Sequence, residues 1–176
     1  FVAAVGDSVF VVSGTSTIAT LNALNVTVTA GTDVTTYDGG AARVDSGRLI
    51  LKDLTITGSD TIATARNGGG VYVAAGASLS LSSAAFVNNR ASASGGAIYN
   101  DGTVLASSGS SSFTNNSAVN GGAIYAATNS TTTLSSASFS TNRATVNGGA
   151  VYQQGGTAAF TSSSFTDNSA VDGGAV

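Results

Sequence analysis

A tandem repeat of about 26 residues, short runs of alternating polar and apolar residues, and a scarcity of helix-forming side chains together predict an all-β fold. The specific prediction is a right-handed parallel β-helix (a β-solenoid) of about six coils, each about 25–29 residues long. The repeat is clearest between Phe86 and Val176. A period this regular marks structural units that stack on one another, so the function must be sought on a repeat scaffold.

The repeat unit combines two motifs, each present in four copies. The first motif, Phe-x-x-Asn, supplies Phe86 with Asn89, Phe113 with Asn116, Phe139 with Asn142, and Phe165 with Asn168. The second motif, Gly-Gly-Ala followed by an aliphatic residue, supplies the pairs Gly95-Gly96, Gly121-Gly122, Gly148-Gly149 and Gly173-Gly174. Successive phenylalanines lie 27, 26 and 26 residues apart, as expected for coils of nearly constant length.

Weaker copies extend the repeat toward the N-terminus. Glycine runs begin at Gly68 and Gly39, and residues 25–29 alternate like residues 53–57, which lie 28 residues further on. We therefore expect a single β-helix domain over residues 1–176, a fragment of a longer chain, with divergent coils in 1–66 and regular coils in 67–176. The stacked coils of the β-helix are expected from about residue 20 through Val176.

Composition argues against the competing repeat folds. The chain has no Pro, Met, Cys, Trp or His, and its coils consist mainly of Ser, Thr, Ala, Gly, Asn and Val. Helical repeats need long helix-forming side chains at 3.6-residue spacing, which are missing here, whereas short alternating runs broken by Gly, Asn and Asp indicate strands and turns. Leucine-rich repeats need a recurring leucine framework, and left-handed β-helices need a strict six-residue period. Neither pattern is present.

Strand alternation predicts which side chains face the core. The phenylalanines form one expected inward column, and the aliphatic residues after the glycine motif form another, made of Val71, Ile98, Ile124, Val151 and Val176. The asparagines fall at a bend, where asparagine tolerates left-handed geometry and its amide can bond along the stack. The glycine pairs precede strands without a following helix or Lys-Ser/Thr, so they indicate tight corners rather than a phosphate site.

One outward feature could be a site. A tyrosine directly follows the aliphatic residue after the glycines that begin at Gly68, Gly95, Gly121 and Gly148. Alternation places these tyrosines outside on adjacent coils: Tyr72, Tyr99, Tyr125 and Tyr152. Two interpretations stay open. The row is either an aromatic ladder that stiffens the sheet or a contact strip for a partner, since tyrosine combines a large apolar body with a polar tip.

The paired motifs resemble those of the polymorphic outer-membrane proteins, the chlamydial-type autotransporter adhesins. The resemblance covers residues 86–176 well and 39–85 weakly. It implies a secreted β-helical passenger that projects from the cell surface and contacts other cells. The chain departs from the family pattern in having no cysteine. The resemblance implies an extracellular or outer-surface location.

Charge and composition disfavour several other functions. A net charge of −3 argues against nucleic acid, and no membrane-spanning segment is evident. Without His or Cys no usual zinc site or Ser-His-Asp triad can form, and we predict no catalytic, cofactor or metal residues. The acids are scattered aspartates, of which Asp167 and Asp172 take turn positions filled elsewhere by neutral residues. The densest charged group is Arg43, Asp45, Arg48, Lys52 and Asp53, which indicates surface salt bridges more than a lyase site.

The favoured function is therefore a non-enzymatic surface module, either an adhesin passenger or a structural stalk. A filament-forming subunit is the alternative, and a polysaccharide-binding or polysaccharide-degrading β-helix is weaker still. Ice binding would need outward threonines in register on successive coils. Thr27 and Thr29 align in this way with Thr55 and Thr57, but the later coils do not continue the pattern, so ice binding is disfavoured. Expected partners are other cell-surface proteins or glycans, or further copies joined end to end through unpaired strand edges.

Overall fold

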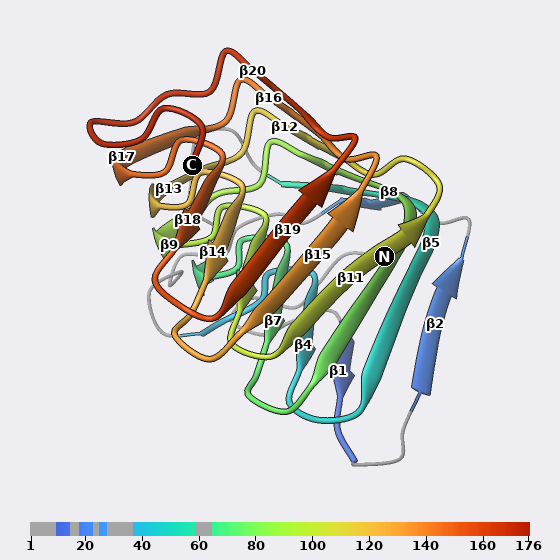
Figure 1. Cartoon of the computed structure of the whole chain (residues 1–176). Helices are drawn as coiled ribbons and strands as arrows, with labels where there is room; N and C mark the ends of the chain where they lie inside the picture. The colour runs from blue at the N-terminus through green and yellow to red at the C-terminus, as the bar shows by residue number, and fades with distance from the viewer. Residues whose placement is uncertain (1–9, 15–17, 23–24, 28–36, 59–64) are drawn as a thin grey trace.

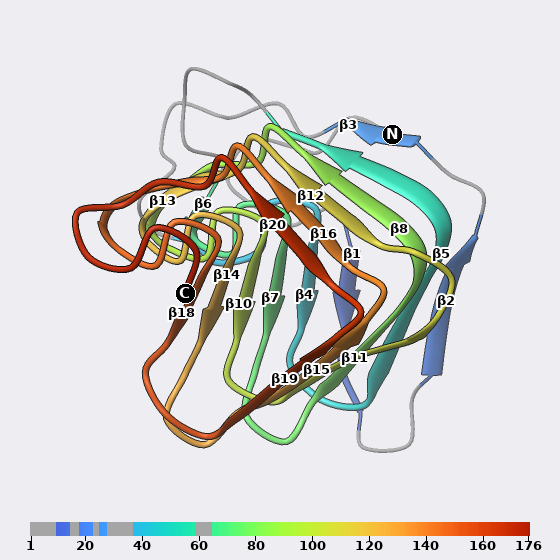
Figure 2. The same cartoon turned by 45° about the horizontal axis from the view of Figure 1, so that its top comes forward.

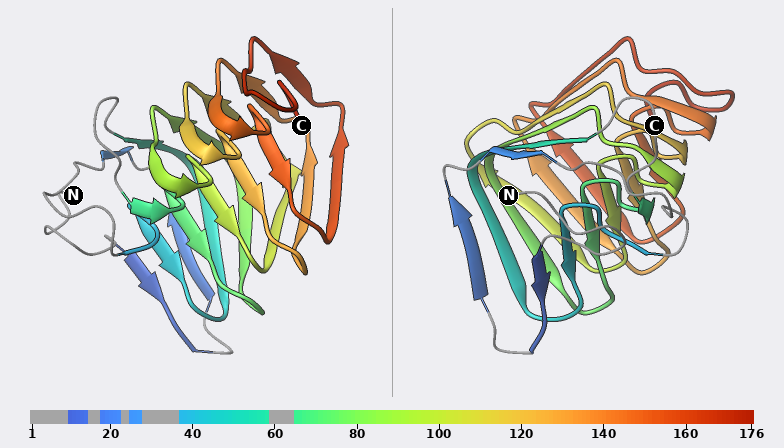
Figure 3. Two further views of the ribbon diagram at one scale, coloured as in Figure 1. Left: turned by 90° about the vertical axis from the view of Figure 1, so that its left-hand side faces the viewer. Right: turned by 180° about the vertical axis from the view of Figure 1, so that it is seen from behind.

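The protein forms a stack of coils whose strands pair in parallel from one coil to the next (Figure 1). The structure is a computed structural model that describes residues 10–14, 18–22, 25–27, 37–58 and 65–176. All strand pairs in these ranges are parallel, as the repeat predicts. Figure 3 shows the coils following one another from the N-terminal to the C-terminal end. The β-solenoid is thus confirmed, whereas the hand of its winding stays a prediction.

Sheet A carries the strands that follow the glycine motif. Its six strands are, in spatial order, β1 (Phe10–Val12), β4 (Ala42–Val44), β7 (Val71–Val73), β10 (Ile98–Asn100), β14 (Ile124–Ala126) and β18 (Val151–Gln153). Six passes along one face correspond to five turns between the first and the last strand. Sheet A begins at Phe10, so the expected start near residue 20 was too late.

Sheet B lies opposite and has two halves. The first half contains β2 (Ile18–Asn22), β11 (Thr103–Ser108), β15 (Thr131–Ser135) and β19 (Thr157–Thr161). The second contains β3 (Asn25–Thr27), β12 (Ser112–Thr114), β16 (Ser138–Ser140) and β20 (Ser164–Thr166). The long strands β5 (Arg48–Thr57) and β8 (Ser78–Val87) run through both halves.

A residue with left-handed backbone geometry marks the boundary between the halves of sheet B. These residues are Asp53, Ser83, Gly109, Ser136 and Ser162, with φ between 49° and 68°. The bend interrupts the strand in the later coils, so a coil there contains four short strands. Register also differs at the N-terminal end: Asn25 pairs with Thr55 and Thr27 with Thr57, an offset of 30 residues rather than 28.

Sheet C closes each coil. Its strands are β6 (Ala65–Asn67), β9 (Ala91–Ser94), β13 (Ser117–Asn120) and β17 (Arg143–Asn147). In Figure 2 these strands lie to one side of the core that sheets A and B enclose. The elements of the described residues are all strands, and none of those residues forms a helix that could cross a membrane.

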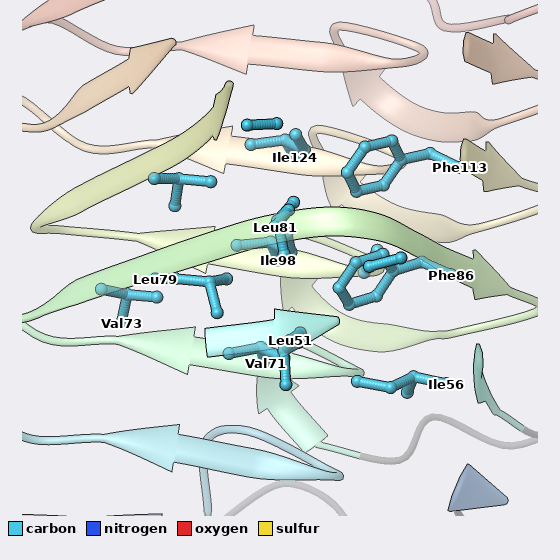
Figure 4. Close-up of a cluster of buried hydrophobic side chains, with 14 of the residues drawn as sticks. Leu51, Ile56, Val71, Val73, Leu79, Leu81, Phe86, Ile98, Phe113 and Ile124 are labelled. Atoms are coloured by element: carbon cyan, nitrogen blue, oxygen red, sulfur yellow. The ribbon is translucent and has the colours of Figure 1, made fainter. Parts of the chain in front are cut away.

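The core fills the space between sheets A and B (Figure 4). Ile98, Ile124 and Val151 are fully buried in register with one another, which confirms the predicted aliphatic column. Leu79 and Leu81 approach them from the other side. Val176 was also expected in the column, but it is 58% exposed and lies outside the strands of sheet A.

The phenylalanine column is the second part of the core. Phe86, Phe113 and Phe139 are buried and pair in register, and their rings stack almost parallel with centroids 5.1 and 4.7 Å apart. Phe165 continues the column at 4.7 Å from Phe139 but is only partly buried in the last coil. Below Phe86 the column passes to Ile56, its register partner. The inward assignment of the phenylalanines is confirmed.

Candidate functional site

The four tyrosines form one continuous row on the outer face of sheet A. Tyr72, Tyr99, Tyr125 and Tyr152, which we call the tyrosine strip, are register partners on β7, β10, β14 and β18. The first three rings are stacked, with centroids 5.2 and 4.9 Å apart and planes within about 10° of each other. The ring of Tyr152 is tilted by 38° and lies 5.5 Å from Tyr125. The spacing follows directly from the separation of paired strands.

Stacking decides which parts of these rings a partner can reach. Each inner ring has a neighbouring ring against both faces, so the faces of Tyr99 and Tyr125 are covered. A sugar ring therefore cannot lie flat on them, and what remains accessible is a row of ring edges and hydroxyl groups. The Tyr125 hydroxyl already donates a hydrogen bond to Oε1 of Gln154.

A charged cluster ends the strip on its N-terminal side. The Arg43 guanidinium lies 5.1 Å from the centre of the Tyr72 ring, a cation–π contact, and Nε of Arg43 donates to Asp45 at 2.6 Å. Asp38 lies deeper and is 6% exposed. It accepts two hydrogen bonds from Arg66 at 3.2 and 3.0 Å, and two more from Asn67. These contacts satisfy the buried carboxylate, so the cluster anchors the coil rather than offering a reactive acid.

The environment of the strip raises the pKa of three of its tyrosines. Burial raises the pKa of Tyr99 to about 12, with smaller contributions from Tyr125 and Asp101. Burial also raises the pKa of Tyr72, with Asp38 adding to the effect, and that of Tyr125. Tyr72, Tyr99 and Tyr125 therefore keep their protons to a higher pH than an ordinary tyrosine does.

The glycine pairs hold the coils close together, as predicted. The first glycine of each pair has left-handed geometry, with φ of 67° at Gly95, 63° at Gly121, 61° at Gly148 and 65° at Gly173. The second glycine lies against the next coil: a Cβ on Gly96 would come within 2.1 Å of the Gly122 carbonyl oxygen. Gly122 and Gly149 are equally restricted, whereas a Cβ on Gly174 would have its nearest neighbour at 3.4 Å. The pairs are packing elements, which accounts for their place in the motif.

The motif asparagines form a buried ladder through the interior of the stack. Asn89, Asn116 and Asn142 are fully buried. Nδ2 of Asn116 donates to Oδ1 of Asn142 at 2.9 Å, and Oδ1 of Asn116 accepts from both the backbone N–H and Nδ2 of Asn89. Asn142 donates in the same way to Asn168. The predicted amide bonding along the stack is confirmed.

The left-handed bend lies one residue before the ladder, not at the ladder asparagines themselves. Its residues are Asn88, Asn115, Thr141 and Asp167, with φ between 53° and 57°. The ladder asparagine therefore has a hydrogen-bonding task, and its predecessor forms the turn.

The two aspartates that replace neutral residues of the repeat lie at turns. Asp167 is at the exposed bend just described, and Asp172 bridges to Asn147 at the end of sheet C, so both occupy the turn columns expected from the sequence. Lys52 and Asp53 form only a long surface ion pair of 3.9 Å. Within the ranges the structure describes, no group of three or more His, Cys, Asp or Glu side chains is placed to hold a metal ion.

These features coincide with a known repeat. Residues 83–101, 110–127 and 136–154 match the Chlamydia polymorphic membrane protein repeat, and each segment contains one Phe-x-x-Asn, one glycine pair and one tyrosine. The three matched segments cover less than half of the chain. In structural terms, each matched segment runs from the second half of sheet B through sheet C and into sheet A. No curated protein and no solved structure shows a significant match to the chain.

The polymorphic membrane protein repeat thus corresponds to the parts that hold neighbouring coils together. Its phenylalanine fills the core, its asparagine extends the ladder, and its glycine pair permits close approach. Of these motif side chains, the tyrosine is the one that points outward. Among the motif residues, the tyrosine strip is therefore the candidate functional site.

Proposed function

We propose that the chain is a non-enzymatic, extracellular β-solenoid module, the passenger or stalk of a surface protein, which holds a contact surface away from the cell. The polymorphic membrane protein repeats carry the proposal, because that family implies an outer-membrane or surface autotransporter context. The stack of parallel strands supports it physically. Each strand spacing adds about 4.8 Å, so five turns extend the module by roughly 24 Å.

The short connections favour a scaffold over a loop-based receptor site. In residues 65–176 the strands are joined by tight corners, and successive coils repeat the same path (Figure 3). Recognition would then use the flat outer faces of the sheets. The tyrosine strip is the contact surface we propose within the repeats, through its ring edges and hydroxyls, with a protein partner rather than a sugar stacked on a ring.

Surface exposure of the module is the first test. An antibody raised against this chain should label intact cells that express the parent protein. Labelling that requires permeabilised cells would contradict the extracellular assignment. Attachment of chain-coated beads to cultured cells then separates the two roles: coated beads that attach no better than uncoated ones indicate a stalk.

The double variant Tyr99→Ser/Tyr125→Ser tests the strip itself. Loss of bead attachment at a temperature where the variant remains folded is the expected result for a contact strip. Full attachment combined with a lowered unfolding temperature would show that the strip only stiffens the sheet, as expected for aromatic cross-strand pairs worth about 0.2–1 kcal/mol each. Arg48→Ser, on the outer side of sheet B, is a suitable variant outside the strip.

End-to-end association is a second candidate role. The outermost strands in the described strand order, such as β18 and β19, each have one paired neighbour. An unpaired edge can template another chain, so we expect the 176-residue chain to self-associate as its concentration rises. A constant monomer mass in sedimentation experiments over a wide concentration range would contradict a filament role.

A further inference from the structure

A shallow trough crosses the outer face of sheet C, on a different face from the tyrosine strip. Ala91, Ala118 and Ala144 are buried at its floor, so the residues on either side of each alanine point outward. The lining is formed by Arg90, Ser92, Ser117, Val119, Arg143 and Thr145. The hollow has a volume of about 470 Å³, and a second hollow of about 240 Å³, which shares Arg143 and Thr145, continues it past Ser169. We call this feature the arginine trough.

The two arginines lie in one column along the trough. Arg90 bridges to Ser117, and Ser117 pairs with Arg143, so the arginines are separated by two strand spacings, or about 9.6 Å. The described residues that line the trough include no carboxylate. None of the described acids lies within ion-pair distance of Arg143, in contrast to Arg43 and Arg66, which are bound to aspartates. Arg143 therefore places an exposed positive charge in the trough, on a chain whose net charge is −3.

The direction of the trough restricts what can bind. It runs along the stack, across the strands, and the main-chain groups of those strands are committed to bonds between coils, such as Ser117 N to Asn89 O and Arg143 N to Asn116 O. An extended peptide therefore cannot add as a further strand. The described lining contains no aromatic ring on which a nucleic-acid base could stack.

The remaining recognition groups are hydroxyls and guanidinium forks. Ser92, Ser117 and Thr145 can exchange hydrogen bonds with sugar hydroxyls, and an arginine fork matches the oxygens of a carboxylate or sulfate. We propose that the arginine trough binds a linear acidic polysaccharide that lies along the stack, with anionic groups on Arg90 and Arg143. The proposal rests on the proposed exposure of the module at the cell surface for its biological use, but not for its test.

Heparin is the probe, and binding to the purified 176-residue chain is measured by calorimetry at low and moderate ionic strength. Arg90→Ser/Arg143→Ser should weaken heparin binding by tenfold or more, because hydrogen bonds to charged groups contribute about 1.5–3 kcal/mol each. The salt dependence of binding should also become shallower. Arg143→Lys should retain part of the affinity, since lysine keeps the charge without the fork.

Lys52→Ser is the matched control for the single variant Arg143→Ser, because it removes one exposed positive charge from sheet B. It should change the heparin affinity by less than about twofold, as expected for a charge outside the trough. Equal losses in Arg143→Ser and Lys52→Ser would overturn the proposal, as would unchanged binding in the double variant. Equal binding of dextran, which is neutral, or of polyglutamate would overturn the ligand class. Heparin binding by a chain that antibodies detect only inside cells would instead leave the trough standing and refute the proposed surface role.

Discussion

Truncation of Phe113 gives the most direct test of how the stack is held together. The ring is fully buried and lies between Phe86 and Phe139, with centroid separations of 5.1 and 4.7 Å. Phe113→Ala removes this ring while the strands above and below remain paired, so the cavity can collapse only in part. Such substitutions cost about 3–5 kcal/mol, and the loss of two stacked pairs places the expected cost toward the upper end.

Urea unfolding followed by circular dichroism measures the effect. With a slope of about 2 kcal/mol per molar urea, a loss of 4 kcal/mol lowers the midpoint by about 2 M. Phe165→Ala should cost about half as much, because this ring is only partly buried and has one stacked neighbour. Asp101→Asn, in a turn, should change stability by less than about 0.5 kcal/mol. Similar urea midpoints for Phe113→Ala and Asp101→Asn would refute the contribution to stability that we assign to the phenylalanine column.

Three further predictions concern the other columns. Asn116→Ala should lower the free energy of unfolding in urea by about 2–4 kcal/mol, because it leaves buried donors and acceptors without hydrogen-bond partners. Asn115→Gly at the exposed bend should be nearly neutral. Gly122→Ala should prevent close stacking and abolish cooperative unfolding, since its Cβ would lie 2.1 Å from a backbone oxygen, while Gly174→Ala should be tolerated; equal effects would contradict this. The pKa of Tyr99, raised to about 12, means that the folded chain holds a proton that the unfolded chain loses near pH 10. The contribution of Tyr99 to stability should therefore be fully present below about pH 10 and fall as the pH approaches 12. Tyrosinate absorbance that is already complete by about pH 11 would contradict this prediction.

The sequence allowed the columns to be predicted because the repeat preserves their phase. Ile98 and Ile124, like Phe113 and Phe139, occupy equivalent positions in successive copies, and a parallel stack places equivalent positions side by side. The tyrosine strip follows from the same reasoning. The sequence did not predict that the ring faces are covered, because the packing of the side chains decides how the rings lie against one another.

The errors have equally specific causes. Two asparagines stand together at Asn88-Asn89, so composition does not say which one adopts the left-handed bend. Thr141 and Asp167 did carry the signal, because the position that tolerates replacement is the turn and not the buried ladder. Ser83, Ser136 and Ser162, at the bend between the halves of sheet B, gave no such sequence signal, since serine has no marked preference for left-handed geometry. The arginine column could have been found, as Arg90 and Arg143 lie two repeat periods apart with Ser117 between them.

The asparagine ladder gives the solenoid a polarity. Asn89, Asn116 and Asn142 each donate toward the C-terminal end of the stack, to Oδ1 of the next asparagine. Backward donation goes only to main-chain carbonyls, such as from Asn116 to Phe86 O. Among the described residues Asn89 Oδ1 has no donor, so the first rung faces its neighbour as an acceptor. A coil inserted upside down would set acceptor against acceptor. A coil added to the stack therefore continues the ladder in only one orientation. In that orientation each added asparagine forms the same amide hydrogen bond with the asparagine of the coil before it.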